Sequence, residues 1–260
     1  MLIATWNVNS IKSRIDLAVR WLEEARPDVV CLQELKCVDD AFPREAIEAL
    51  GYNVAVHGQK TYNGVAILSR LPIEDVTIGL PGDDTDEQAR FVEAVVSTES
   101  GAVRIGGLYL PNGNPAPGPK YDYKLAWMER LIAHARERLL LEEPFILAGD
   151  YNVIPAKADA KRPEVWLKDA LFLPQTRAAW RRLLALGFTE ALRATDEEDG
   201  VYTFWDYQAG AWQKNDGIRI DHLLLSPQAA DRLQAVRVDK HVRSWERPSD
   251  HVPVVIELAA

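Results

Sequence analysis

The chain has 260 residues, 47% of them hydrophobic, and a formal net charge of −9. This composition is ordinary for a globular protein with a sizeable core, and the charge argues against a surface coated with positive charge for non-specific nucleic-acid binding. No stretch has the apolar length of a membrane span, and the N-terminus lacks a basic region followed by an apolar one. We therefore expect a cytoplasmic protein that does not enter a membrane.

The two cysteines are too few for a disulfide framework. Cys31 lies in an apolar run and Cys37 just after it, which indicates buried, reduced thiols rather than metal ligands. No Ser/Gly tract, long charge block or repeat of fixed period divides the chain. We therefore expect residues 1–260 to form a single domain.

The first elements predicted along the chain are strands that end in polar residues. Residues 2–7 form an apolar run that predicts a strand, and this strand ends in a polar corner at Asn7. Ser10 is the expected N-cap of the helix that follows. Residues 28–34 predict a second strand, buried on both faces, that closes on Glu34.

Two predicted hairpins and a long helix come next. The hairpin strands cover residues 52–57 with 65–68 and residues 91–97 with 103–110. The last of these strands runs into a loop rich in Pro and Gly, which carries Tyr109 to the strand's edge. Residues 121–141 place apolar side chains at helical spacing and predict the longest amphipathic helix.

The most informative stretch lies near the middle of the chain. The apolar run that starts at Phe145 predicts a strand buried on both faces, and it delivers Asp150 and Asn152 to its open end. Gly-Asp-x-Asn alone is typical of a turn, but other strands of this chain end in the same way. A later helix has Thr176 as its expected cap.

The last quarter of the chain contributes three more polar residues at strands. Asp221 lies inside the apolar stretch 218–226, where a carboxylate is unfavourable unless another group pairs with it. Asp250 and His251 directly precede the closing strand, residues 252–258.

Together these strand-end residues predict a metal-dependent hydrolase. Carboxylates that gather at one place repel one another, and they need a cation or a shifted pKa. The absence of thiolates from the set favours Mg²⁺ or Mn²⁺ over zinc. A hard metal with a His and an Asp that orients it suits hydrolysis of an anionic ester, most obviously a phosphodiester. The residues are Asn7, Glu34, Tyr109, Asp150, Asn152, Asp221, Asp250 and His251.

With these residues in view, the chain resembles an exonuclease III-type AP endonuclease of the endonuclease/exonuclease/phosphatase superfamily. The matching stretches come in the family order and spread over nearly the whole length. They are Ala4–Asn9, Leu32–Lys36, Tyr109–Gly113, Gly149–Asn152, Arg219–His222 and Ser249–Val254. Each motif alone is weak, whereas the ordered set is highly specific.

The resemblance implies an α+β fold, a four-layer α/β sandwich in which two mixed β-sheets pack face to face with helices on the outer faces. It implies Glu34 as the principal ligand of Mg²⁺ or Mn²⁺, with Asn7 and Asp250 completing the site directly or through water. In the same pattern Asp150 orients and deprotonates the attacking water, and Asn152 holds Asp150 and the phosphate. His251, braced by Asp221, and Tyr109 stabilise the charge that builds on the phosphate oxygens. The number of metals and the identity of the base stay open.

The implied substrate is double-stranded DNA with abasic sites or blocked 3′ ends, cleaved by a monomer. Incision 5′ to abasic sites, 3′–5′ exonuclease and 3′-phosphatase or phosphodiesterase activities are the expected reactions. The expected substrate contacts are Asn112, Phe204, Trp205, Ile218 and Arg219, and Ile218 stands where some relatives place an aromatic residue. The cations in candidate DNA-side loops are Lys120, Lys124, Lys157, Lys161, Arg162, Lys214, Arg219 and Arg247.

Other members of the superfamily are the alternatives. Deoxyribonuclease I-like enzymes are secreted and usually bear disulfides, which the cysteine content opposes. Inositol polyphosphate phosphatases, sphingomyelinases and deadenylases share the Glu, Asp-x-Asn and Asp-His elements. The segment Thr203–Trp205 before Arg219–Asp221 favours the AP endonuclease branch. A catalytically silent binding protein on the same scaffold is disfavoured because every expected catalytic position holds the expected residue type.

Overall fold

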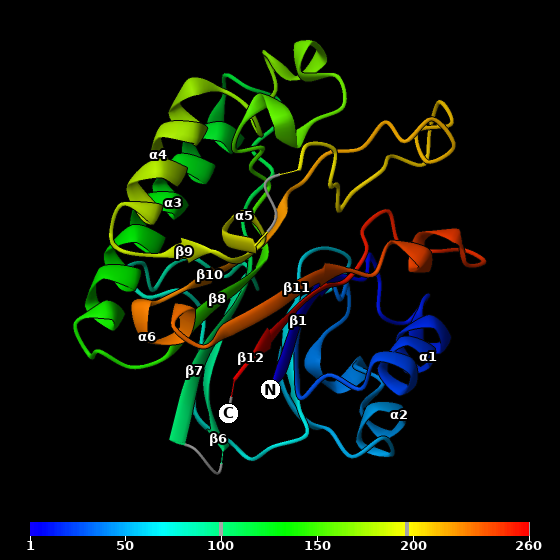
Figure 1. Cartoon of the computed structure of the whole chain (residues 1–260), viewed down its shortest axis with the longest axis vertical. Helices are drawn as coiled ribbons and strands as arrows, with labels where there is room; N and C mark the ends of the chain where they lie inside the picture. The colour runs from blue at the N-terminus through cyan, green and yellow to red at the C-terminus, as the bar shows by residue number, and fades with distance from the viewer. Residues whose placement is uncertain (99–100, 196–197, 260) are drawn as a thin grey trace.

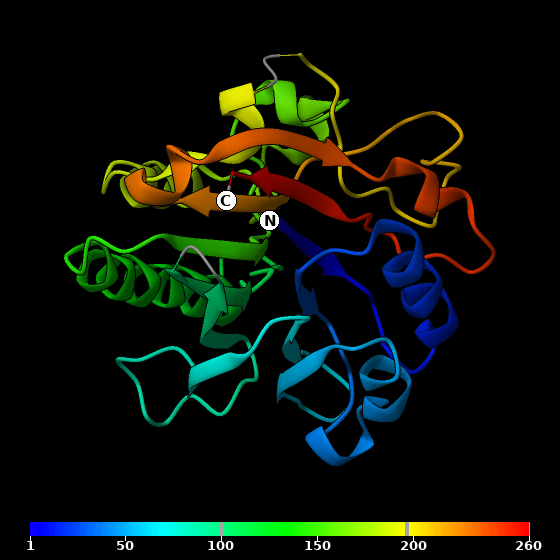
Figure 2. The ribbon, with the colours of Figure 1, turned by 60° about the horizontal axis from the view of Figure 1, so that its bottom comes forward.

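The computed structural model describes residues 1–98, 101–195 and 198–259. Two six-stranded sheets lie at its centre, with helices on both outer sides (Figures 1 and 2). In the first sheet the strand order is β11 (Leu233–Val238), β12 (Val254–Leu258), β1 (Leu2–Asn7), β2 (Val29–Gln33), β4 (Val65–Ser69) and β3 (Asn53–His57). In the second it is β5 (Ile73–Ile78), β6 (Phe91–Thr98), β7 (Gly101–Tyr109), β8 (Phe145–Asp150), β10 (Asp221–Leu225) and β9 (Thr189–Glu190).

Both sheets are mixed, since β1 and β2 run parallel, as do β7 and β8, while the other pairs are antiparallel. Helices α1 (Ile15–Ala25) and α2 (Arg44–Glu48) cover the first sheet, and α3 (Pro119–Leu139) and α4 (Pro174–Leu184) cover the second. The shorter helical segments are α5 (Ala191–Thr195), α6 (Pro227–Ala230), η1 (Asp39–Ala41), η2 (Lys157–Asp159), η3 (Pro163–Trp166) and η4 (Lys240–Ser244). The predicted four-layer α+β fold is confirmed.

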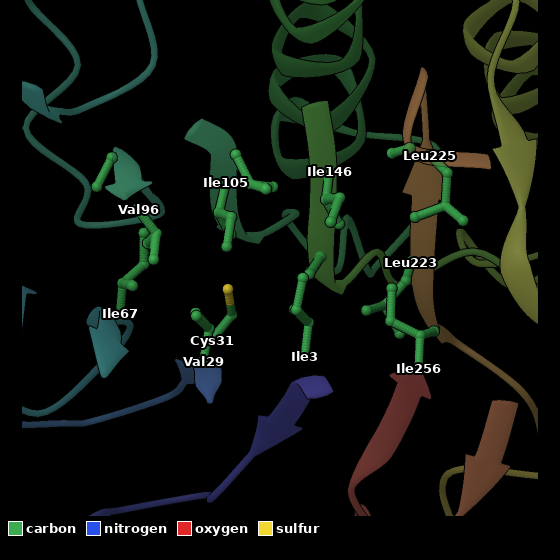
Figure 3. Packing of buried hydrophobic residues seen from close by; sticks show 14 of the residues in the cluster. Ile3, Val29, Cys31, Ile67, Val96, Ile105, Ile146, Leu223, Leu225 and Ile256 are labelled. Carbon is green, nitrogen blue, oxygen red and sulfur yellow. The ribbon is translucent and has the colours of Figure 1, made fainter. Parts of the chain in front are cut away.

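The main core lies between the two sheets. Figure 3 shows Ile3 and Cys31 of the first sheet pointing toward Ile105 and Ile146 of the second, and all four side chains are fully buried. Because each inner strand packs on a sheet on one face and on helices on the other, its sequence reads as a continuous apolar run. Cys31 and Cys37 are buried free thiols, as predicted. No helix within the described ranges is long and apolar enough to span a membrane.

Three local predictions differ from the structure. Ser10 does not cap a helix, because the chain after β1 keeps pairing with the chain after β2, where the N–H of Ser10 donates to the carbonyl of Glu34 at 2.7 Å. Helix α1 therefore starts only at Ile15. Thr176 lies inside α4, and its hydroxyl donates to the carbonyl of Ala170 at 2.7 Å.

The third difference concerns Asp221, which opens β10 instead of lying within a longer strand. The preceding Ile218 pairs with Phe204 in an isolated bridge. The hydroxyl oxygen of Thr203 accepts the N–H groups of Ile220 and Asp221 at 3.1 and 3.2 Å. This side-chain cap ends the irregular segment, and the regular ladder begins at Asp221.

Candidate active site

Strand ends from both sheets bring the predicted catalytic residues into one cleft. In the second sheet, Asp150 at the end of β8 is the register partner of both Tyr109 on β7 and Asp221 on β10. In the first sheet, Asn7 at the end of β1 lies beside the end of β2, directly before Glu34. The carboxyl ends of the parallel pairs β1/β2 and β7/β8 lie at one edge of each sheet, and β10 runs antiparallel to β8, so its first residue, Asp221, lies at the same edge as Asp150.

Asp150 is the centre of the site. It is 1% exposed, and its Oδ2 accepts a hydrogen bond from Asn7 Nδ2 at 2.9 Å while its Oδ1 accepts the N–H of Asn152 at 2.9 Å. Burial and the charge of Asp221 raise the pKa of Asp150 to about 7. The preceding Gly149 is required by packing, since a Cβ there would lie 2.0 Å from the carbonyl oxygen of Leu108 on β7.

His251 faces Asp150 and is oriented by Asp221. Its Nδ1 lies 2.8 Å from Asp221 Oδ2, and its Nε2 lies 3.7 Å from Asp150 Oδ2. Burial alone lowers the pKa of His251, but the carboxylates of Asp221 and Asp150 raise it to about 10. The imidazole is therefore a cation near neutral pH, with one N–H held by Asp221 and the other turned toward the cleft.

The Glu34 carboxyl group is held in its ionised form by its neighbours. Burial raises its pKa, but the hydrogen bond from Asn7 and the charge of Lys36 outweigh burial and lower it below the usual value. Asn7 Nδ2 donates to Glu34 Oε1 at 2.9 Å, and Lys36 Nζ lies 3.0 Å from Glu34 Oε2. Tyr109 faces the same carboxylate, and burial with the charges of Glu34 and Asp150 raises its pKa well above the ordinary value.

The donor set fits a hard divalent cation. Glu34, Asp150 and His251 each offer a ligand atom within 4.8 Å of the other two, and Asp250 lines the same cleft. Carboxylate oxygens suit Mg²⁺ or Mn²⁺, whereas a protonated imidazole is not a ligand. Asn7 Oδ1 accepts the N–H of Asn9 at 3.0 Å, and its Nδ2 faces the two carboxylates.

The cleft has a polar wall and an apolar wall. Asn112 Nδ2 donates to Asn152 Oδ1 at 3.2 Å on the polar wall. Phe204 and Ile218 both line the apolar wall, and the Phe204 ring lies 5.0 Å from the His251 ring in an edge-to-face arrangement. The other lining residues are Asn114, Asp169, Trp166, Leu171 and Ile220.

Three predicted DNA contacts lie inside the protein. Trp205 is fully buried and packs edge-to-face on Trp212, so it does not line the cleft. Arg219 is 1% exposed and pairs with Asp159 at 2.8 Å and Glu190 at 2.9 Å. Lys124 is fully buried in α3. The other predicted cations are exposed, namely Lys120, Lys157, Lys161, Arg162, Lys214 and Arg247.

Several residues that support the site were not predicted from the sequence. Asn9 Nδ2 donates to Asp250 Oδ1 at 3.0 Å, and Lys36 Nζ donates to Asn9 Oδ1. Both residues belong to the matched stretches, and their polar character beside strand ends was the available signal. Trp166 and Leu171 come from an irregular segment, where no periodic pattern indicates which way a side chain faces.

Comparisons with known proteins agree with this geometry. The model of the endonuclease/exonuclease/phosphatase family matches residues 4–251. The chain is 32% identical to exodeoxyribonuclease III of Haemophilus influenzae over 99% of this chain and 100% of the relative. Two solved structures each match over 100% of both chains. A 3′ phosphatase from Neisseria bound to a product DNA hairpin has a TM-score of 0.96 at 40% identity, and an AP endonuclease from Archaeoglobus fulgidus has 0.95 at 35%. The chain therefore belongs to the endonuclease/exonuclease/phosphatase family, in the branch that holds exodeoxyribonuclease III and the AP endonucleases.

Proposed function

We propose that the protein is a DNA-repair nuclease that hydrolyses the phosphodiester 5′ to abasic sites in duplex DNA and also processes 3′ ends as an exonuclease and 3′-phosphatase or phosphodiesterase. One observation carries the proposal. A buried carboxylate, Asp150, faces the His251–Asp221 pair and Glu34 at the floor of a cleft that has an apolar wall. The polar floor suits a phosphodiester, and the apolar wall suits a sugar without a base.

The residues divide the chemistry between them. Glu34, with Asp250, would hold Mg²⁺ or Mn²⁺, which supplies Lewis-acid stabilisation of the phosphoryl oxygens when bound. Asn7 keeps the carboxylates of Glu34 and Asp150 in place by donating to both. Asp150 orients a water molecule and accepts its proton.

His251 and Tyr109 are the donors that stabilise the transition state. His251, oriented by Asp221, directs an N–H toward the charge that builds on the phosphate oxygens. Tyr109 keeps its hydroxyl proton, since its pKa is raised, and donates to the same oxygens. Asn152 fixes Asp150 through its backbone N–H and donates from its side chain to the carbonyl of Leu110 at 2.9 Å.

Abasic recognition would occur at the apolar wall. An extruded deoxyribose is slim enough for a cleft that a normal nucleotide does not enter, and flipping costs least where no base is stacked or paired. Phe204 and Ile218 are the wall residues connected to the catalytic His251, since Phe204 forms isolated bridges with both His251 and Ile218.

The test compares two substrates. Wild-type protein should incise a duplex with one abasic analogue in Mg²⁺ and not in a chelator. Phe204→Ala should lower this incision at least tenfold more than it lowers removal of a 3′-phosphate at a nick, which needs no flipped sugar. Leu140→Ala, at an exposed position past the end of α3, is the control. Equal loss of both activities at unchanged thermal stability would contradict the pocket, and no incision by wild type would contradict the abasic preference.

We also propose that residues 1–260 act as one monomeric domain in the cytoplasm. The shared core between the two sheets, built from strands at both ends of the chain, supports a single folding unit. Light scattering at micromolar concentration would test the monomer, and a dimer mass would contradict it.

A further inference from the structure

Lys124 is a fully buried lysine next to the candidate active site. Its Nζ donates to the carbonyl oxygens of Asn112 at 3.1 Å and Asn152 at 2.5 Å. Burial lowers the pKa of Lys124 to about 7, although the carboxylates of Asp150 and Asp169 oppose the shift. A buried ammonium is costly unless hydrogen bonds compensate for lost hydration. The hydrogen bonds to the two carbonyl groups therefore compensate for the burial of the Lys124 ammonium group.

The two carbonyls belong to the residues that form the polar wall. Asn112 follows β7 and Asn152 follows β8, so Lys124 connects the ends of two neighbouring strands through its two hydrogen bonds. The same two residues are also joined by their side chains, since Asn112 Nδ2 donates to Asn152 Oδ1. The N–H of Asn152 in turn donates to Asp150 Oδ1. Asn152 has a φ of 47°, in the left-handed region that a non-glycine residue adopts only when its surroundings hold it there.

The loop that carries Asn112 rests directly on the lysine side chain. Gly113 has a φ of 90°, and a Cβ on it would lie 2.6 Å from Lys124 Cδ. Asn114 donates its backbone N–H and its Nδ2 to Asn112 Oδ1 at 3.1 and 3.0 Å, and its Nδ2 also lies 3.0 Å from Asp169 Oδ1. With its oxygen occupied in this way, the Asn112 amide can direct only its nitrogen toward Asn152.

We infer that Lys124 is a positioning residue for phosphodiester hydrolysis: it clamps the backbones of Asn112 and Asn152 so that their paired amides, and through them Asp150, keep the geometry that the reaction needs. A misplacement of about 1 Å at such a site can cost on the order of 10²-fold in rate. The inference rests on the nuclease reaction of the proposed function and not on the preference for abasic sites. It also replaces the expectation that Lys124 contacts DNA.

The first experiment uses Lys124→Met, which keeps the aliphatic stem under Gly113 and removes the ammonium. The single-turnover rate at saturating DNA should fall by about 10- to 100-fold. The Kd for the same DNA, measured in Ca²⁺, and its salt dependence should stay within about twofold of wild type. Arg136→Met, at an exposed cation in the last turn of α3, is the matched control and should keep the wild-type rate.

A double-mutant cycle separates positioning from general stability. If Lys124 acts through the Asn112–Asn152 amide pair, adding Lys124→Met to Asn152→Ala should lower the single-turnover rate by less than about threefold. The reason is that Asn152→Ala has already removed this hydrogen bond. Gly113→Ala gives a second route to the same result, since its Cβ would lift the loop off Lys124, and the rate should again fall with Kd unchanged. Hydrogen exchange of residues 110–115 should become faster in both Lys124→Met and Gly113→Ala.

Several outcomes would overturn the inference. A wild-type rate in Lys124→Met or in Gly113→Ala would show that the clamp does not position the site. If the rate losses of the two single variants multiply fully in the double variant, Lys124 is a purely structural residue. If Lys124→Met weakens DNA binding and reduces the dependence of that binding on salt concentration, Lys124 contacts a phosphate. The assays use whichever of the abasic and 3′-phosphate duplexes wild type cleaves faster. Failure of the abasic preference is therefore a separate result from failure of the clamp.

Discussion

Replacing Arg219 by Met should destabilise the fold and leave DNA affinity almost unchanged. The Arg219 guanidinium lies 2.8 Å from Asp159 Oδ1 and 2.9 Å from Glu190 Oε1, and it contacts His222 Nδ1 at 3.0 Å. The Asp159 side chain is 2% exposed and that of Glu190 8%. Without the guanidinium, the carboxylates of Asp159 and Glu190 would stay buried, and each would lose one of its hydrogen-bond donors.

The magnitude follows from what would be left behind. Removing one partner of a buried ion pair typically costs about 3–5 kcal/mol, because the remaining charge loses its compensation. Asp159 keeps Arg193 as a partner at 2.7 Å, and Glu190 keeps the N–H of Arg193 at 2.9 Å. We therefore expect a loss near the lower limit, about 3 kcal/mol. For a chain of this size that loss lowers Tm by about 6 °C.

Thermal and urea unfolding of Arg219→Met measure this loss, and Arg162→Met is the control. Arg162 pairs with Asp216 at the surface and is 55% exposed, so its removal should lower stability far less than the removal of Arg219. DNA affinity in Ca²⁺ completes the comparison. Unchanged stability together with weaker, less salt-dependent DNA binding would refute the argument, because it would mean that Arg219 reaches DNA as its position in the sequence suggested.

Four further predictions concern the metal, the chemical step, acid stability and the substrate class. Glu34→Gln should keep the fold and raise the Mg²⁺ concentration needed for half-maximal cleavage, and equal activity at limiting Mg²⁺ would rule out Glu34 as a ligand. His251→Asn should lower the single-turnover rate by about 10²-fold or more with little change in Kd, and a variant that only weakens binding would exclude its role in the transition state. Burial by itself raises the pKa of Glu190, but neighbouring His222 and Arg219 lower it from 4.5 to about 2. A depressed carboxyl pKa stabilises the fold above pH 4.5, so about 3 kcal/mol should be lost as the pH falls from 4.5 to 2, and acid unfolding of Glu190→Gln should lack this component. The logarithm of the DNA binding constant should fall steeply with the logarithm of KCl concentration in Ca²⁺, whereas a flat line would indicate a small phosphoester substrate such as an inositol phosphate.

The sequence determined the inner strands and the residues at their ends. Strands such as residues 2–7 and 145–150 are buried on both faces, and continuous apolar runs report such burial directly. Polar residues that interrupt those runs, such as Asp150, stand out because an unpaired carboxylate is unfavourable there. Each of these signals is local, and the ordered motifs then related them to one family.

Only the tertiary structure decided which charged side chains face the cleft and which lie inside. The guanidinium of Arg219 and its partner Asp159 are 60 residues apart in the chain, and the contacts of Lys124 come from two different strand ends. A lysine or arginine in a polar stretch has the same local sequence whether it binds DNA or a buried carboxylate. The difference is the partner that the fold brings to it, and such a partner can lie anywhere along the chain.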